Sequence, residues 1–113
     1  MYKRQVTYTV NGGGAIGIQQ ISLNVPGDFS ISQNYPNPFN PVTNIEFSVP
    51  VSAYVKLTVF DVTGRELETL VSQNMTAGTY KADWDASKYS SGVYFYTITS
   101  GSYHQTKKMI LIK

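Results

Sequence analysis

The sequence predicts an all-β protein, and three observations support this prediction. Apolar and polar residues alternate with a period of two, for example from Val55 to Val59, which places one set of side chains on a buried sheet face. These runs are rich in β-branched residues and tyrosine, which suit a half-buried pleated surface. Turn signals separate the runs at intervals of roughly 8–12 residues. The combination is typical of an immunoglobulin-like β-sandwich of about seven antiparallel strands.

The expected strands follow one another with short connections. They lie near residues 29–33, 44–49, 53–60, 66–71, 78–84, 92–99 and 103–112. Asp61 and Gly64 occupy the first and fourth positions of a type I turn after the third of these strands. Further turn signals lie at residues 74–78, 90–92 and 100–102. The expected centre of the core is Trp84, accompanied by Val55, Leu57, Val59 and Tyr80.

Residues 1–27 have a different character from the rest of the chain. An alternating run is broken by three consecutive glycines at 12–14 and resumes loosely before Pro26 and Gly27 mark a boundary. The segment is interpreted as a linker or the remnant of a preceding domain, because consecutive glycines favour flexibility. The alternative is an extra hairpin on the sandwich. The predicted division is therefore 1–27 and 28–113, with residues 24–27 as the expected processing site.

Composition excludes several classes of protein. A chain of 113 residues fits one domain, and the absence of cysteine excludes disulfides, thiolate zinc sites and cysteine nucleophiles. The net charge of +2, with 14% charged residues, is too sparse for a nucleic-acid-binding face. The apolar run at 109–112 is far shorter than the roughly 18 residues of a membrane helix. The chain begins without the pattern of a signal peptide.

One segment is unusual in its density of proline. Three prolines remove three backbone donors, so no central strand can run through it. Its asparagines can hydrogen-bond their own backbone. We expect a stiff, extended crossover with Tyr35 and Phe39 as apolar plugs. The segment consists of Asn34, Tyr35, Pro36, Asn37, Pro38, Phe39, Asn40 and Pro41.

This segment and several motifs after it resemble, in the same order, the type A C-terminal sorting domain of type IX (Por) secretion cargo. The later motifs include Gly64, Arg65, Trp84, Asp85, Gly92, Val93 and Tyr94. The chain ends with Lys107, Lys108, Met109, Ile110, Leu111, Ile112 and Lys113. The likeness covers about residues 28–113. An immunoglobulin-like module of flagellar hook-capping proteins is similar, but it does not need this final run.

The resemblance implies a function without catalysis. Members of the family are the last domain of larger secreted proteins of Bacteroidota and relatives. The outer-membrane type IX translocon reads the domain as an address, and a sortase-like surface peptidase often removes it. The resemblance therefore implies a cargo domain on the N-terminal side, passage through the periplasm and outer membrane, and a secreted or cell-surface location. It implies no cofactor.

The final run has a structural and a sorting interpretation. Residues 109–112 fit a strand that is buried on both faces or paired beside the core, and the flanking lysines discourage edge-to-edge aggregation. The resemblance adds that residues 107–113 are the sorting signal, read by a strand added to an exposed edge.

Three other functions are weighed against sorting. A carbohydrate-binding sandwich would present a row of exposed aromatic residues, for which Tyr89, Tyr94, Tyr96 and Tyr103 are candidates. Calcium would need more oxygen ligands than Asp83 and Asp85 supply, and these are expected to bond turn backbone or face water. Catalysis is not expected, since His104 is the single histidine and no nucleophile elbow is present.

Overall fold

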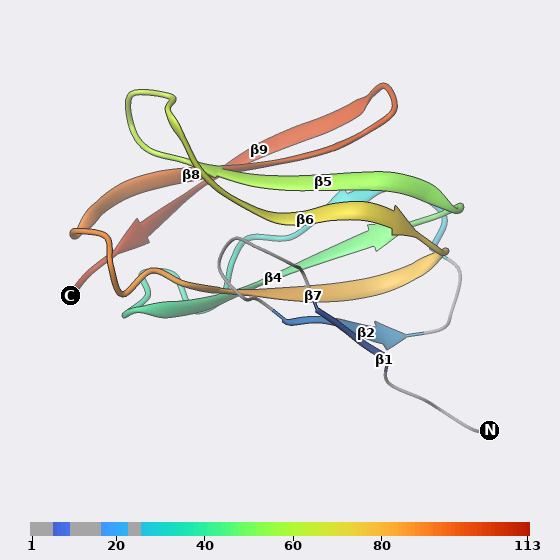
Figure 1. Cartoon of the computed structure of the whole chain (residues 1–113), viewed down its shortest axis with the longest axis horizontal. Coiled ribbons are helices and arrows are strands. Elements are labelled where there is room, and N and C mark those ends of the chain that lie inside the picture. The colour runs from blue at the N-terminus through green and yellow to red at the C-terminus, as the bar shows by residue number, and fades with distance from the viewer. Residues whose placement is uncertain (1–5, 10–16, 23–25) are drawn as a thin grey trace.

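The computed structural model describes residues 6–9, 17–22 and 26–113, and all regular structure within them is β-strand (Figure 1). One sheet has five strands in the order β1 (Val6–Thr9), β2 (Gly17–Ser22), β7 (Gly78–Asp85), β4 (Val42–Val49) and β3 (Ser30–Ile31). The other has four strands in the order β6 (Glu66–Met75), β5 (Ala53–Phe60), β8 (Gly92–Ser100) and β9 (Tyr103–Leu111). Neighbouring strands pair antiparallel throughout. The predicted all-β sandwich is confirmed.

The seven expected strands correspond to β3 through β9. Two of them differ in length from the prediction by more than two residues. β3 is reduced to two residues, because the proline-rich segment follows it closely, and β6 runs on to Met75, so that only residues 76 and 77 separate it from β7. The turn from Asp61 to Gly64 lies between β5 and β6, as the sequence predicts.

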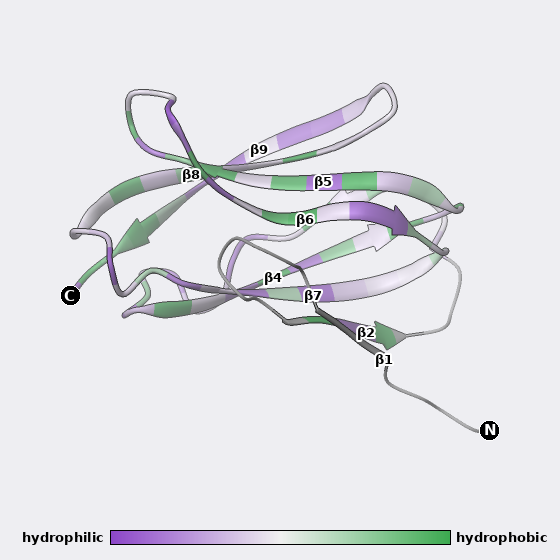
Figure 2. Ribbon diagram, in the orientation of Figure 1, coloured by the Kyte–Doolittle hydropathy of each residue, from purple (hydrophilic) through white to green (hydrophobic). Residues whose placement is uncertain are grey.

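The core lies between the two sheets and is formed by the inward positions of each strand. Along β7 the buried residues are Gly78, Tyr80, Ala82 and Trp84, every second residue. Figure 2 shows hydrophobic and hydrophilic residues alternating along part of β5. The expected core is confirmed, since Trp84, Tyr80, Val55, Leu57 and Val59 are all fully buried. Burying such large apolar side chains stabilises the fold by about 1.5–3 kcal/mol each.

Part of residues 1–27 belongs to the five-stranded sheet. β2 pairs with β7, with Ile18 opposite Ala82 and Gln20 opposite Tyr80, and β1 pairs with β2. Ile18 is fully buried and Gln20 is 4% exposed. The described strands β1 and β2 are therefore paired with each other at the edge of this sheet, beside β7. The boundary at residue 28 stays a prediction, and its expected processing site at 24–27 lies partly outside the described residues.

Tyr96 connects the two sheets through its hydroxyl group. The side chain is fully buried on the inner face of β8, and its hydroxyl donates to the carbonyl of Ser32 at 2.7 Å. Burial raises the pKa of Tyr96 from 10.0 to about 12. The folded protein therefore holds this proton at pH values where the unfolded chain has lost it.

The Ile18→Ala substitution tests whether β2 is an integral strand. Because Ile18 is fully buried, we expect a loss of about 2–5 kcal/mol in the free energy of unfolding, measured by urea denaturation of the full chain. Gln19→Ala on the same strand is the control and should change it by less than about 0.5 kcal/mol. Equal effects of the two substitutions would contradict a packed β2.

Alkaline unfolding tests the burial of Tyr96. Stability should be complete below pH 10 and fall as the pH rises toward 12, because only the unfolded chain releases the phenolic proton in this range. Tyr96→Phe should make this fall shallower, although loss of the hydrogen bond costs about 0.5–1.5 kcal/mol at neutral pH. Urea titrations between pH 8 and 12 measure both effects. An unchanged dependence in the variant would refute the assignment.

Candidate functional site at the end of the C-terminal strand

The proline-rich segment joins the edges of the two sheets. Tyr35 forms an antiparallel bridge with Asn44 on β4, and Phe39 forms a parallel bridge with Leu111 on β9. The Phe39 amide donates to the Ile110 carbonyl at 3.0 Å, and the Ile112 amide donates to the Phe39 carbonyl at 2.9 Å. The last residues of β9 thus have partners on both sides, β8 and this segment.

Side chains of the segment hold this arrangement. Asn34 is buried, and its amide nitrogen donates to the Thr43 hydroxyl at 2.9 Å and to the Pro36 carbonyl at 3.1 Å. The carbonyl of the Asn37 side chain accepts from the Ile110 amide at 3.0 Å. Gln33, just before the segment, donates to the Lys108 carbonyl at 2.6 Å. The asparagines therefore bond the backbone of the segment itself and also that of β9.

The expected extended crossover is instead a compact loop that bends at residues 36–38. The three peptide bonds before Pro36, Pro38 and Pro41 are cis. Phe39 is 2% exposed, so its prediction as an apolar plug is confirmed, whereas Tyr35 is 77% exposed and its prediction was wrong. Tyr35 pairs with Asn44, which lies on the outer face of β4 between the inward-pointing Thr43 and Ile45.

β9 is an edge strand with one buried face. Met109 and Leu111 are buried in the core, Ile110 is half-buried, and Ile112 is 51% exposed. This is the arrangement of a strand paired beside the core, and not one buried on both faces. Lys113 is attached to the β7–β8 connection, since its amide donates to the Ser91 hydroxyl at 2.9 Å and its ammonium donates to the Ser87 carbonyl.

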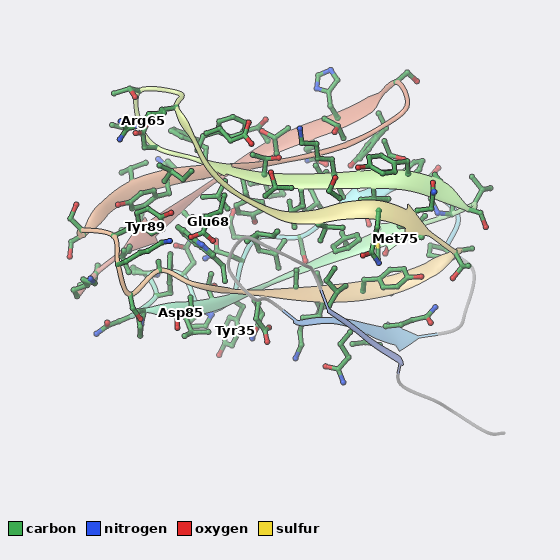
Figure 3. All side chains as sticks on the ribbon, viewed as in Figure 1. Tyr35, Arg65, Glu68, Met75, Asp85 and Tyr89 are labelled. Atoms are coloured by element: carbon green, nitrogen blue, oxygen red, sulfur yellow. The ribbon has the colours of Figure 1, made fainter. Side chains whose placement is uncertain are left out.

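The β5–β6 turn presents Arg65 at the same end of the sandwich (Figure 3). One carboxylate oxygen of Asp61 accepts from the amides of Thr63 at 2.9 Å and Arg65 at 3.0 Å, and from the Thr63 hydroxyl at 2.6 Å. These hydrogen bonds lower the pKa of Asp61. Gly64 has a φ of 87°, a conformation that favours glycine. The Nε atom of Arg65 lies 3.2 Å from the other carboxylate oxygen of Asp61. The turn is therefore rigid.

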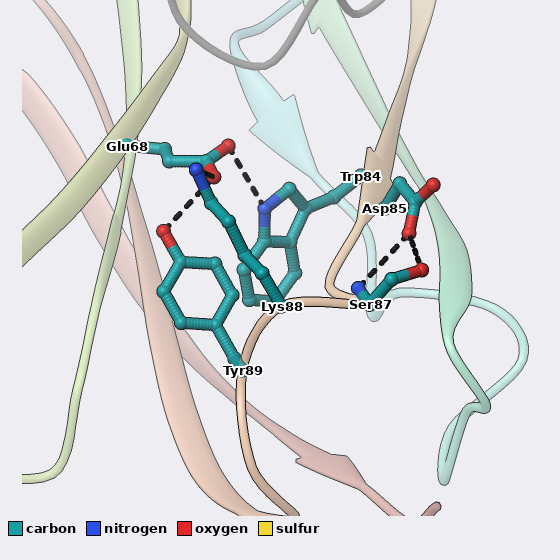
Figure 4. A network of polar contacts seen from close by, with 6 residues as sticks. All are labelled: Glu68, Trp84, Asp85, Ser87, Lys88 and Tyr89. Carbon is teal, nitrogen blue, oxygen red and sulfur yellow. Dashed lines mark hydrogen bonds and ion pairs between the residues drawn. The ribbon is translucent and has the colours of Figure 1, made fainter.

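A buried carboxylate links β6 to β7 and to the loop that follows it (Figure 4). Glu68 accepts from the Trp84 indole nitrogen at 3.2 Å and from the Tyr89 hydroxyl at 2.9 Å, and Lys88 lies 3.5 Å away. Burial, followed by the bond to Glu68, raises the pKa of Tyr89 to about 12. Three donors thus compensate the burial of this charge.

Sequence reasoning did not single out Glu68. If residues of β6 alternated simply from Leu67 onward, the carboxylate of Glu68 would point outward. Register shifts in β6 place it opposite the inward-facing Val59 instead. A β-bulge of this kind leaves no clear signal in a single sequence.

The residues predicted from the motifs gather around Trp84 at this end. The Trp84 ring lies 5.8 Å from Phe39, 5.6 Å from Tyr89 and 5.8 Å from Tyr94. On the neighbouring sheet, Gly92, Val93 and Tyr94 pair with Leu111, Ile110 and Met109. The exposed members of the predicted set are Tyr35, Pro36, Asn37, Pro38, Asn40, Gly64, Arg65, Asp85, Val93, Lys108, Ile112 and Lys113. The buried members are Asn34, Phe39, Trp84, Tyr94, Met109 and Leu111, with Pro41, Gly92, Lys107 and Ile110 half-buried.

The other candidate chemistries are less well supported. The exposed tyrosine row that a carbohydrate-binding sandwich would need is not formed by the four candidates, because Tyr94 and Tyr96 are buried and Tyr103 stacks on Phe29 at 5.1 Å. Asp85 bonds turn backbone as predicted, accepting from the Ser87 amide at 2.9 Å. Within the described ranges, no three His, Cys, Asp or Glu side chains gather where they could hold a metal ion.

A pair of substitutions in the proline-rich segment tests its role as a plug. Phe39→Ala should lower the free energy of unfolding by about 3–5 kcal/mol, because it empties the space beside Trp84 and Leu111. Tyr35→Ala, four residues earlier and exposed, should change it by less than about 0.5 kcal/mol. Denaturation in urea measures both, and a small effect of Phe39→Ala would exclude the plug.

Comparison with known proteins gave one result that bears on this end of the molecule. A family model described as a secretion system C-terminal sorting domain matches residues 33–113. Comparison with curated proteins and with solved structures gave no match. None of the described residues forms a helix capable of crossing a membrane. The matched range begins at Gln33, just before the proline-rich segment, and contains every motif residue gathered around Trp84 and β9. On this match the chain belongs to the family of type IX secretion C-terminal sorting domains.

Proposed function

We propose that this chain is a non-catalytic address that directs an attached N-terminal cargo across the outer membrane by type IX secretion, to the medium or the cell surface. The proposed partners are the outer-membrane translocon and a sortase-like surface peptidase. The single observation that carries the proposal is the pairing of Phe39 with Leu111. This pairing joins the proline-rich motif to the C-terminal motif, although Phe39 and Leu111 are 72 positions apart in the sequence.

The buried and exposed motif residues have different proposed roles. The buried ones, such as Trp84 and Met109, hold the end of the sandwich in one conformation. The exposed side chains of Lys108 and Ile112 are available to a receptor, and that of Lys113 is also exposed although its ammonium donates to the Ser87 carbonyl. Because the tail is held by the Phe39 carbonyl and by Ser91, it is ordered before binding, which reduces the entropy lost on recognition.

Recognition through side chains fits this end better than strand addition. The outer backbone groups of Ile110 and Ile112 already bond to Asn37 and Phe39, so an incoming strand would have to displace them. Lys107 is half-buried on the inward side of this edge strand, a position that discourages pairing with another strand.

The structure also guides the design of the export experiment. Deletion of residues 108–113 would remove Met109 and Leu111 from the core, so a loss of export could reflect unfolding. Substitution of exposed side chains avoids this ambiguity. The double variant Ile112→Ser and Lys113→Ala keeps both buried residues and the backbone of the tail.

We expect this double variant to reduce export of a signal-peptide-bearing fluorescent reporter fused to residues 1–113, by about tenfold or more in a type IX-competent bacterium. The matched control is Val51→Ser with Lys56→Ala, which also removes one exposed aliphatic and one exposed lysine side chain, at other positions. Export is measured as reporter in the medium and on the surface. Equal export of both folded variants would exclude recognition of the tail, and retention of the unmodified fusion would exclude the sorting function.

A further inference from the structure

A cleft of about 390 Å³ lies at the same end of the sandwich, between the β5–β6 turn and the β7–β8 connection. Its volume falls within the roughly 300–1,000 Å³ of typical ligand sites. Val62 and Arg65 line one side, and Lys88, Tyr89 and Val93 line the other. The side chains of Val62, Arg65, Lys88 and Val93 are exposed, whereas Tyr89 is half-buried and packs against Trp84.

The walls of the cleft are fixed before any partner binds. On one side the Asp61 carboxylate holds the turn through the amides of Thr63 and Arg65. On the other side the Tyr89 hydroxyl is bound to Glu68 at 2.9 Å, and the Tyr94 hydroxyl donates to the Ser90 carbonyl at 2.6 Å. A preformed site loses little conformational entropy on binding.

The charges of the cleft are arranged by depth. The Arg65 and Lys88 side chains are 77% and 71% exposed, while those of their partners Asp61 and Glu68 are 18% and 7% exposed. Asp61 and Glu68 are engaged by several donors from their own surroundings. The cations therefore project toward solvent and the carboxylates are recessed, so that an approaching molecule meets positive charge first.

Apolar side chains line the cleft together with these cations. Val62 is 70% exposed and Val93 is 36% exposed, and both line the cleft beside the ring of Tyr89. The surface thus offers contacts for an aliphatic side chain together with two cationic groups. An arginine guanidinium and a lysine ammonium both form charge-assisted hydrogen bonds with carboxylates.

We propose that this cleft binds an extended acidic segment of the export machinery, in which carboxylates flank an aliphatic side chain. The carboxylates would pair with Arg65 and Lys88, and the aliphatic side chain would cover Val62 and Val93. This inference rests on the proposed sorting function, because it names the chemistry of the partner that reads this end of the domain.

Peptide binding tests the chemistry independently of export. The probe is acetyl-Glu-Val-Glu-Val-Glu-amide, titrated into the ¹⁵N-labelled full chain and followed by amide chemical shifts. We expect the chemical-shift changes to cluster at residues 61–65 and 88–93. The affinity of the peptide should fall about fivefold or more at high salt. The glutamine counterpart of the peptide should bind at least about tenfold more weakly. No binding at millimolar peptide, equal binding of the glutamine peptide, or shifts elsewhere would overturn the proposal.

The double variant Arg65→Gln and Lys88→Gln tests the two cations. It keeps the backbone bonds of the turn and the bonds of Glu68 to Trp84 and Tyr89, and thermal unfolding of the variant checks that it stays folded although Glu68 loses its ion pair. Peptide affinity should fall about tenfold or more. Lys56→Gln with Lys81→Gln removes the same charge away from the cleft and should leave affinity unchanged. Equal affinities of the two variants would overturn the assignment.

The reporter fusion separates this inference from the sorting function. Two results together would support both the cleft proposal and the sorting function. These are reduced export of the Arg65→Gln and Lys88→Gln variant, and normal export of the Lys56→Gln and Lys81→Gln control. Full export of the cleft variant alongside the unmodified fusion would overturn the cleft and leave the sorting function standing. Retention of the unmodified fusion would overturn the sorting function, and with it the identity of the partner.

Discussion

The structure at the C-terminal end of the sandwich depends on hydrogen-bond partners for the backbone of the last strand, β9. β9 lies at the edge of its sheet, and an unpaired edge exposes donors and acceptors that invite pairing with other chains. The proline-rich segment supplies partners for Ile110 and Ile112 through Phe39 and Asn37. The same segment inserts the Phe39 ring beside Trp84. One short loop thus completes a sheet edge and the core together.

This arrangement gives a physical account of why the motifs are dispersed along the chain. Phe39, Trp84, Tyr94 and Met109 come from different elements but meet at one end of the sandwich. Several of these residues are needed to build the end, while Arg65, Lys88 and Ile112 project from it. A surface of this kind can vary in its exposed chemistry while its scaffold stays constant.

The sequence was sufficient to predict strands β3 through β9 and the centre of the core, because alternation with period two reports burial directly. It also marked the proline-rich segment as special through its missing donors. It did not reveal that Phe39 pairs with Leu111, since contacts between distant segments leave no local pattern. For a related reason, Tyr35 was wrongly predicted to be an apolar plug and the buried Glu68 was not singled out. The direction of each side chain depends on a bridge or bulge that composition does not encode.

The position of β2 has a consequence for the covalent continuity of the domain. β2 is held by the backbone of β7 and by the burial of Ile18, yet it precedes the range that the family model matches. A break in the chain between Ser22 and Pro26 would therefore not by itself separate the two parts. Release of the N-terminal part would also require β7 to give up its pairing with β2 and Ile18 to leave the core.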